Sequence, residues 1–151
     1  MSDKAVTNST CLIGLQRIGQ LEILPQVFPV VFAPPAVQTE VGINLSWLRV
    51  QAVQNTAFVT VLQESIHRGE AEAIALAIEL KDVVVILDEK KARAVAKKLG
   101  LQVTGTVGML LRGKKRGVIP EIKPLLYSLQ ETGFRLSENL IQEALRLAGE
   151  S

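Results

Sequence analysis

Hydrophobic residues along the chain follow two periods. Short apolar runs, some with the alternating pattern of strands, are separated by longer stretches in which apolar residues recur about every 3.6 positions, as in helices. Strands are predicted at residues 5–6, 28–32, 47–52, 83–87 and 101–103. The run Val83–Leu87 is apolar on both faces, which is typical of an interior parallel strand. Trp47–Ala52 alternates, and we place it near an edge of the sheet.

Helical patterns fill the intervals between these strands. They are predicted at about residues 12–18, 21–24, 36–41, 56–66, 70–80 and 120–131, between Asp88 and Gly100, after Gly105, and after Ser137. Strands that alternate with helices indicate a parallel sheet covered on both faces. We therefore expect the α/β class, a three-layer α/β/α sandwich with a central, mostly parallel sheet, formed as one domain over residues 1–151.

Composition narrows the classes of site that the chain can carry. With 151 residues, 48% of them hydrophobic, the chain suits a single core. One cysteine (Cys11) and one histidine (His67) exclude an internal disulfide and a zinc site rich in these residues. No apolar run approaches the ~20 residues of a membrane span. We expect a cytoplasmic protein that makes no membrane contact.

Polar residues stand where predicted strands end and helices begin. They are Asn8 after the first strand, Glu40 in the helical turn after the second, Glu70 at the start of the alanine-rich helix, and Asp88 after the run 83–87. In an open parallel sheet, ligands gather beyond these strand ends. Clustered carboxylates repel one another unless a proton or a cation lies among them. Mg²⁺ or Mn²⁺ suits such oxygen ligands and would activate water at a phosphodiester.

Each of these residues also has a purely structural interpretation. Asp88 could be the N-cap of the following helix, and Glu70 could stabilise a helix N-terminus through the macrodipole. Asn8 could cap a helix or form a turn, and Glu40 could be an ordinary surface acid. Glu72 either supports the site or, more simply, is a solvated charge.

Charge is distributed unevenly, although the net charge is only +2. The segment between Asp88 and Gly117 holds nine of the 17 basic residues: Lys90, Lys91, Arg93, Lys97, Lys98, Arg112, Lys114, Lys115 and Arg116. Such a segment could hold the phosphates of a nucleic acid beside an acidic pocket. It could equally be a solvated helix face followed by a charged loop.

Four segments together resemble the PIN-domain superfamily. They are residues 7–13 (TNSTCLI), 34–40 (PPAVQTE), 69–77 (GEAEAIALA) and 87–93 (LDEKKAR), and residues 103–106 and 110–112 continue the likeness. The chain is most similar to a small prokaryotic branch of predicted nucleic-acid-binding proteins with unassigned function. The resemblance extends from about Ala5 to Ala148.

The resemblance implies a Rossmann-like sandwich whose acidic pocket binds Mg²⁺ or Mn²⁺ and cleaves single-stranded RNA. Many such proteins are toxin ribonucleases paired with an antitoxin protein, and homodimers are common. Glu40, Glu70 and Asp88 match the acids of the family motifs. Asn8 stands where most active members have aspartate, and Glu70 replaces what is commonly aspartate. Asparagine supplies a carbonyl oxygen but no charge, so metal affinity should suffer.

Two hypotheses follow for the function. The first is a metal-dependent ribonuclease of PIN type, a candidate toxin, in which Asp88, Glu70 and Glu40 hold the metal and Asn8 positions metal or water. The alternative is a catalytically weakened or inactive PIN-like module that binds RNA or a protein. A small-molecule-binding domain of the response-regulator type is less well supported, because its lysine and phosphoacceptor pattern is missing.

Overall fold

The computed structural model describes residues 2–151, so Met1 of the expected domain lies outside the described residues. Its centre is a five-stranded sheet in the order β3-β2-β1-β4-β5. The strands are β1 (Lys4–Val6), β2 (Val30–Ala33), β3 (Leu48–Val50), β4 (Val84–Ile86) and β5 (Gln102–Thr104). Every pairing is parallel, which confirms the predicted α/β class. The strand predicted near an edge, β3, is an edge strand.

The direction in which strands are added reverses at β1. Ala5 of β1 pairs with Val31 of β2 on one side and with Val84 of β4 on the other. The chain first adds β2 and β3 outward, then returns to place β4 beside β1. The carboxyl ends of β1 and β4 are therefore neighbours at a topological switch point, where sheets of this kind bind ligands. We call this side of the sheet the carboxyl edge.

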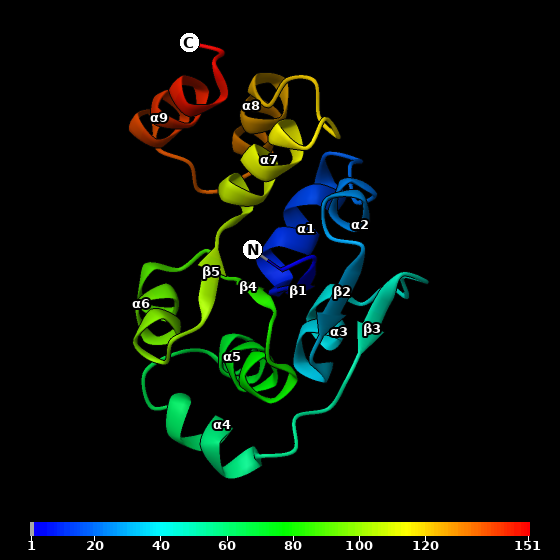
Figure 1. Ribbon diagram of the computed structural model, residues 1–151, viewed down its shortest axis with the longest axis vertical. Helices are drawn as coiled ribbons and strands as arrows, with labels where there is room; N and C mark the ends of the chain where they lie inside the picture. The colour runs from blue at the N-terminus through cyan, green and yellow to red at the C-terminus, as the bar shows by residue number, and fades with distance from the viewer. Residues whose placement is uncertain (1) are drawn as a thin grey trace.

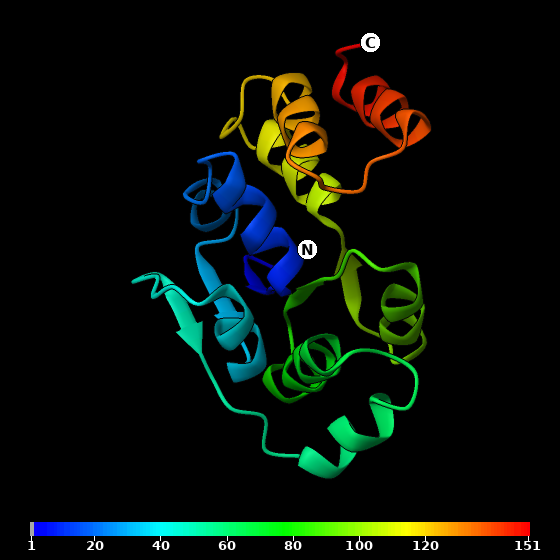
Figure 2. The same ribbon diagram turned by 180° about the vertical axis from the view of Figure 1, so that it is seen from behind.

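Nine helices surround the sheet in the described residues 2–151. They are α1 (Ser9–Arg17), α2 (Ile23–Val27), α3 (Pro35–Val41), α4 (Thr56–Leu62), α5 (Arg68–Leu80), α6 (Lys90–Lys98), α7 (Thr106–Lys115), α8 (Lys123–Glu131) and α9 (Glu138–Ala148). In Figure 1 helices α4, α5 and α6 lie on one side of the strands, whereas α1, α2 and α7 lie on the other, with α8 and α9 beyond them. Figure 2 shows the same arrangement from behind. The three-layer sandwich is confirmed.

Alternate strand residues supply two separate hydrophobic cores. Ala5 and Val84 pack with α1, α2, α7, α8 and α9 on one face. Val6 and Val85 pack with α4, α5 and α6 on the other. The alanines of α5 are at most 1% exposed, and their small side chains let the helix backbone lie close to the sheet. The rigid sheet and α5 thus position the loops at the carboxyl edge.

Several element boundaries differ from the prediction. Pro25 was expected to end a helix, but it lies within α2, at the third position of Ile23–Val27. A proline in the first helical turn leaves no intrahelical hydrogen bond unmade, because those first N–H groups have no acceptor in the helix. Helix α4 ends at Leu62 instead of Ile66, and α8 begins at Lys123 instead of Pro120. Among residues 2–151, no helix has the length and apolar character that crossing a membrane requires.

Candidate functional site

Asn8 and Asp88 meet where β1 and β4 end. Asn8 is the N-cap of α1, and its Oδ1 accepts a hydrogen bond from the backbone N–H of Cys11 at 3.0 Å. Its Nδ2 donates to Oδ2 of Asp88, also at 3.0 Å. Asn8 is only 4% exposed, so water competes little for either bond. The amide therefore presents its NH₂ group, and not its oxygen, to the carboxylate.

Thr106, at the first position of α7, completes the contacts of the Asp88 carboxylate. Oδ1 of Asp88 accepts from the backbone N–H of Thr106 at 2.7 Å, and Oδ2 accepts from the Thr106 hydroxyl at 2.8 Å. A Cβ at Gly105 would lie 3.2 Å from Oδ1, so glycine allows this close approach. Asp88 thus joins β1, β4 and α7 instead of capping α6. The sequence predicted no contact for Thr106, whose one local signal was a threonine at the start of a predicted helix.

Glu40 contacts Ser9 and Gly69, the sequence neighbours of Asn8 and Glu70. Its Oε2 accepts a hydrogen bond from the hydroxyl of Ser9 at 3.0 Å. Its Oε1 lies against Gly69, where an added Cβ would come within 2.5 Å. Helices α1, α3 and α5 therefore meet at the Glu40 carboxylate. This contact gives Gly69 and Ser9 roles that the sequence pattern did not indicate.

Glu70 lies in the first turn of α5, the position at which the sequence suggested that it stabilises the helix N-terminus. It forms a capping box at the start of α5, with the backbone N–H of His67 donating to its Oε1 at 3.4 Å. Partial burial raises the pKa of the Glu70 carboxyl, and the negative charges of Glu89 and Asp88 raise it further. The negative charges that act on Glu70 thus come from Asp88 and from Glu89, an acid for which the sequence predicted no role in the site.

The predicted donors do not fit a divalent metal ion as they are arranged. Within residues 2–151, no three or more side chains of Asp, Glu, His or Cys are grouped so that they could hold one. The oxygen of Asn8 caps α1, and both oxygens of Asp88 accept hydrogen bonds. The structure brings Asn8 and Asp88 into direct contact and Glu70 into electrostatic range, whereas the Glu40 carboxylate is bonded to Ser9, the residue after Asn8.

Glu72 is not the solvated charge that the sequence suggested. It is 8% exposed, and its two oxygens contact different elements. Oε1 accepts from the backbone N–H of Ala36 at the start of α3, at 3.2 Å, and Oε2 pairs with Arg68 Nε at 2.9 Å. Glu72 therefore fixes α3 against α5, and so supports the position of Glu40.

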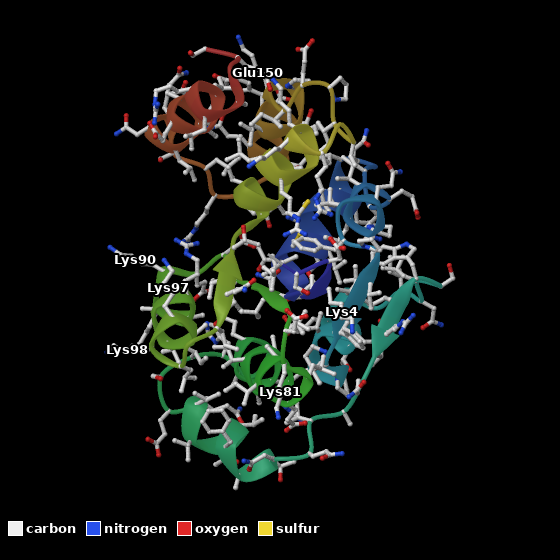
Figure 3. The ribbon with its side chains drawn as sticks, in the orientation of Figure 1. Lys4, Lys81, Lys90, Lys97, Lys98 and Glu150 are labelled. Carbon is white, nitrogen blue, oxygen red and sulfur yellow. The ribbon has the colours of Figure 1, made fainter. Side chains whose placement is uncertain are left out.

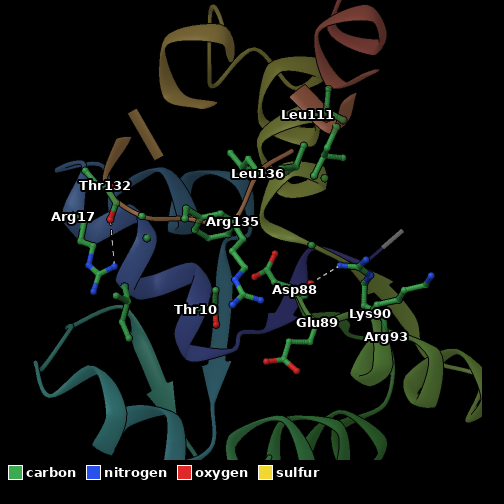
Figure 4. Close-up of a pocket in the computed structure, with 18 of the residues that line it drawn as sticks. Thr10, Arg17, Asp88, Glu89, Lys90, Arg93, Leu111, Thr132, Arg135 and Leu136 are labelled. Atoms are coloured by element: carbon green, nitrogen blue, oxygen red, sulfur yellow. Dashed lines mark hydrogen bonds between the residues drawn. The ribbon is translucent and has the colours of Figure 1, made fainter. Parts of the chain in front are cut away.

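A cleft of about 970 Å³ opens beside Asp88. We call it the Asp88 cleft. Its acidic residues are Asp88 and Glu89, and the basic ones come from three parts of the chain: Arg17 of α1, Arg135 of the α8–α9 connection, and Lys90, Lys91 and Arg93 at the start of α6. Its apolar wall includes Ile13, Leu111, Phe134 and Leu136. Figure 4 shows Asp88 and Glu89 between the basic side chains of the two walls.

The basic segment between Asp88 and Gly117 is divided between two parts of the molecule. Lys90, Lys91 and Arg93 line the Asp88 cleft. Figure 3 shows Lys97 and Lys98 further along the outer side of α6. The remaining four, Arg112, Lys114, Lys115 and Arg116, lie at the C-terminal end of α7, which runs away from the carboxyl edge.

Three of these four residues bind acids and carbonyls of the chain itself. Arg112 stacks on Phe28, with its guanidinium carbon 4.2 Å from the ring centre, and donates to the carbonyl of Ser2 at 2.6 Å. Arg116 pairs with Asp3 at 2.8 Å, and Lys114 pairs with Glu150 at 2.8 Å. These contacts lie at the amino ends of the strands and at the C-terminus, so they serve the fold rather than the cleft.

Comparison with known protein families matches residues 4–150 to the family described as the PIN domain. The match covers the sheet, the helices on both of its faces and the residues of the Asp88 cleft. No curated protein and no solved structure matches the chain significantly.

Proposed function

The chain belongs to the PIN-domain family, and we propose that it binds single-stranded RNA in the Asp88 cleft. The PIN domain is a nuclease-type fold, which makes nucleic acid the expected partner. The observation that carries the proposal is the convergence of basic side chains from α1, α6 and the α8–α9 connection on one cleft at the switch point. Basic groups on opposite walls can contact successive phosphates of one strand.

The proposed binding depends on the charge of the RNA backbone, and not on the direction of the RNA strand or the identity of its bases. Lys90 and Lys91 are exposed at the first turn of α6 and form no ion pair within the described residues. Of the two acids that precede them, Glu89 is exposed, and Asp88 is already bonded to Asn8 and Thr106. Phosphate binding releases counterions from the RNA, so the affinity should fall steeply as salt is added.

Fluorescence anisotropy with a labelled oligouridylate at several salt concentrations tests this proposal. The double variant Lys90→Gln/Lys91→Gln should bind more weakly and show a salt slope smaller by ~1.4, because each single-strand phosphate contact contributes ~0.7. Lys81→Gln, which removes a charge at the other end of β4, is the control and should match the parent. No binding by the parent, or equal binding by all three proteins, would refute RNA binding in this cleft.

A metal-dependent ribonuclease acting on single-stranded RNA is the second candidate. It is favoured by the pKa of Glu70, which burial raises and the negative charges of Glu89 and Asp88 raise further, since a divalent cation would relieve the repulsion among these acids. Mg²⁺ or Mn²⁺ would supply water activation when bound. Against it stands the orientation of the Asn8 amide, whose oxygen caps α1 while its NH₂ group donates to Asp88.

Cleavage assays distinguish the two candidates. RNA cleavage by the parent in Mg²⁺ or Mn²⁺, lost in Asp88→Asn, would support the nuclease. Cleavage that appears only in Asn8→Asp would mean that the native chain is a binding module. As a toxin of a toxin–antitoxin pair, the nuclease would arrest growth when expressed without its antitoxin, and light scattering would test the homodimer expected for such proteins.

A further inference from the structure

We propose that Arg135 binds one RNA phosphate on the wall of the Asp88 cleft that faces α6. The inference rests on the proposed RNA binding. It assigns the residue that contacts the RNA from the wall opposite the lysines of α6. Arg135 lies in the connection between α8 and α9, far in sequence from the other basic residues of the cleft. Nothing in the hydrophobic or charge pattern of the chain indicated it.

The segment that carries Arg135 is held on both sides. The backbone N–H of Phe134 donates to the carbonyl of Leu129 at 3.0 Å, and Nε2 of Gln130 donates to the carbonyl of Leu136 at 3.0 Å. Arg17 adds a longer bond to the carbonyl of Thr132, at 3.4 Å. The backbone at Arg135 is therefore placed before any ligand arrives.

Packing anchors both neighbours of Arg135. The Phe134 ring covers Gly14 of α1 so closely that an added Cβ would lie 2.8 Å from it. Leu136 is 8% exposed in the core with α8 and α9. With its neighbours fixed on either side, the exposed Arg135 side chain is the group of this segment that is available to a ligand.

The Arg135 guanidinium has unused hydrogen-bonding capacity. Arg17 and Arg93 donate to the carbonyls of Thr132 and Asp88, whereas the structure gives the Arg135 side chain no hydrogen bond or ion pair with residues 2–151. In Figure 4 the side chain extends from its segment into the cleft, in the direction of Asp88.

The chemistry of the cleft favours a phosphate as the partner of this group. A guanidinium can donate two parallel hydrogen bonds to a phosphate, and it stays charged at any physiological pH. A phosphodiester approaching Asp88 and Glu89 meets repulsion from both carboxylates, which a cation on the facing wall offsets. An RNA strand that lies between Arg135 and the lysines at the start of α6 would have cations on both sides.

Salt-dependent anisotropy with the labelled oligouridylate tests the role of Arg135. Arg135→Gln should weaken binding by about 10-fold or more and reduce the salt slope by ~0.7, as expected for one lost phosphate contact. Arg135→Lys should keep the slope and recover only part of the affinity, because lysine is a point charge without the guanidinium fork. Arg146→Gln, which removes an arginine paired with Glu143 on the outside of α9, should match the parent.

The outcomes separate this inference from the proposal on which it rests. If Lys90→Gln/Lys91→Gln loses affinity while Arg135→Gln keeps both parental affinity and parental slope, RNA binding stands and the role of Arg135 is refuted. If the parent fails to bind RNA, both are refuted. If polyglutamate displaces the RNA at equal charge concentration, the cleft accepts acidic polypeptides as readily, and the assignment of a phosphate is refuted.

Discussion

The Nδ2 group of Asn8 donates a hydrogen bond to Oδ2 of Asp88 across 3.0 Å, although 80 positions separate the two residues. This bond joins the ends of β1 and β4 at the switch point of the sheet. It also determines what the site can do, because an N–H donor, unlike an oxygen, cannot ligate a metal ion. An aspartate at position 8 would leave two carboxylates in contact there.

Asn8→Asp should convert this attraction into repulsion. The N-cap of α1 survives, since aspartate caps as well as asparagine. The loss of the donor and the new like-charge contact should lower the free energy of unfolding by about 1–3 kcal/mol at neutral pH in EDTA. Millimolar Mn²⁺ should recover much of the lost stability, as measured by thermal unfolding.

Asn55→Asp is the matched control, because Asn55 caps α4 through its Oδ1 in the same way but is exposed. It should respond little to Mn²⁺. An Asn8→Asp variant as stable as the parent in EDTA would contradict the importance of the bond to Asp88.

Thr106→Val should destabilise the protein by about 1–2 kcal/mol. The hydroxyl is fully buried, and removing it leaves one contact of Oδ2 of Asp88 unmade while the side-chain shape is kept. Urea unfolding measures the effect. Thr60→Val removes an exposed hydroxyl that bonds only within α4, at 3.2 Å, and should change stability much less. Equal losses of stability in the two variants would show that the contact of Thr106 with Asp88 does not stabilise the fold.

Glu70→Gln should make the protein less sensitive to pH. Because burial and the charges of Glu89 and Asp88 raise the pKa of Glu70, the folded state holds this proton more tightly than the unfolded state. Stability from the protonated form is then present below the ordinary value of 4.5 and is lost as the pH rises through the folded-state pKa.

Glutamine keeps the capping bond with His67 and removes the charge, so Glu70→Gln should gain about 0.5 kcal/mol over the parent at neutral pH and nothing at lower pH. Melting temperatures across this pH range measure the difference. A gain that is the same at every pH would mean that Glu70 does not titrate as proposed.

Glu150→Gln should weaken the contacts that hold the C-terminal end of the chain and so lower the stability of the protein. Glu150 accepts from Lys114 Nζ at 2.8 Å and from the backbone N–H groups of Ile122 and Lys123 at 2.9 and 3.0 Å. Burial opposes ionisation, but these donors outweigh it and lower the pKa of the carboxyl. We expect a loss of about 1–3 kcal/mol at neutral pH.

Glu150 contributes to folding stability with a pH dependence that is opposite in sign to that of Glu70. With a lowered pKa, the stability from Glu150 is present above 4.5 and disappears as the pH falls through the folded-state value. The deficit of Glu150→Gln, followed by circular dichroism, should therefore shrink in acid. Exposed Glu64→Gln should track the parent throughout.

The sequence by itself determined the class of fold and the approximate order of its elements. The apolar run that forms β4 predicted an interior strand, and the periodic pattern of the alanine-rich α5 predicted a helix, because burial imposes a residue type on each position. Cys11, in the apolar stretch of the first long helix, is fully buried, and burial raises the pKa of its thiol to about 12. Asn8 and Asp88 were also expected to converge at strand ends, and they do.

Only the tertiary structure decided which way side chains point and what they meet. The contacts of Thr106 and Arg135 could not be predicted from the local sequence, because their partners or facing walls lie far away in the chain. The basic segment was divided because α6 begins at the cleft, while the end of α7 meets Asp3, Phe28 and Glu150 on the far side. Periodicity reports the burial of a position, whereas a site depends on the directions of contacts between distant segments, and folding alone sets those directions.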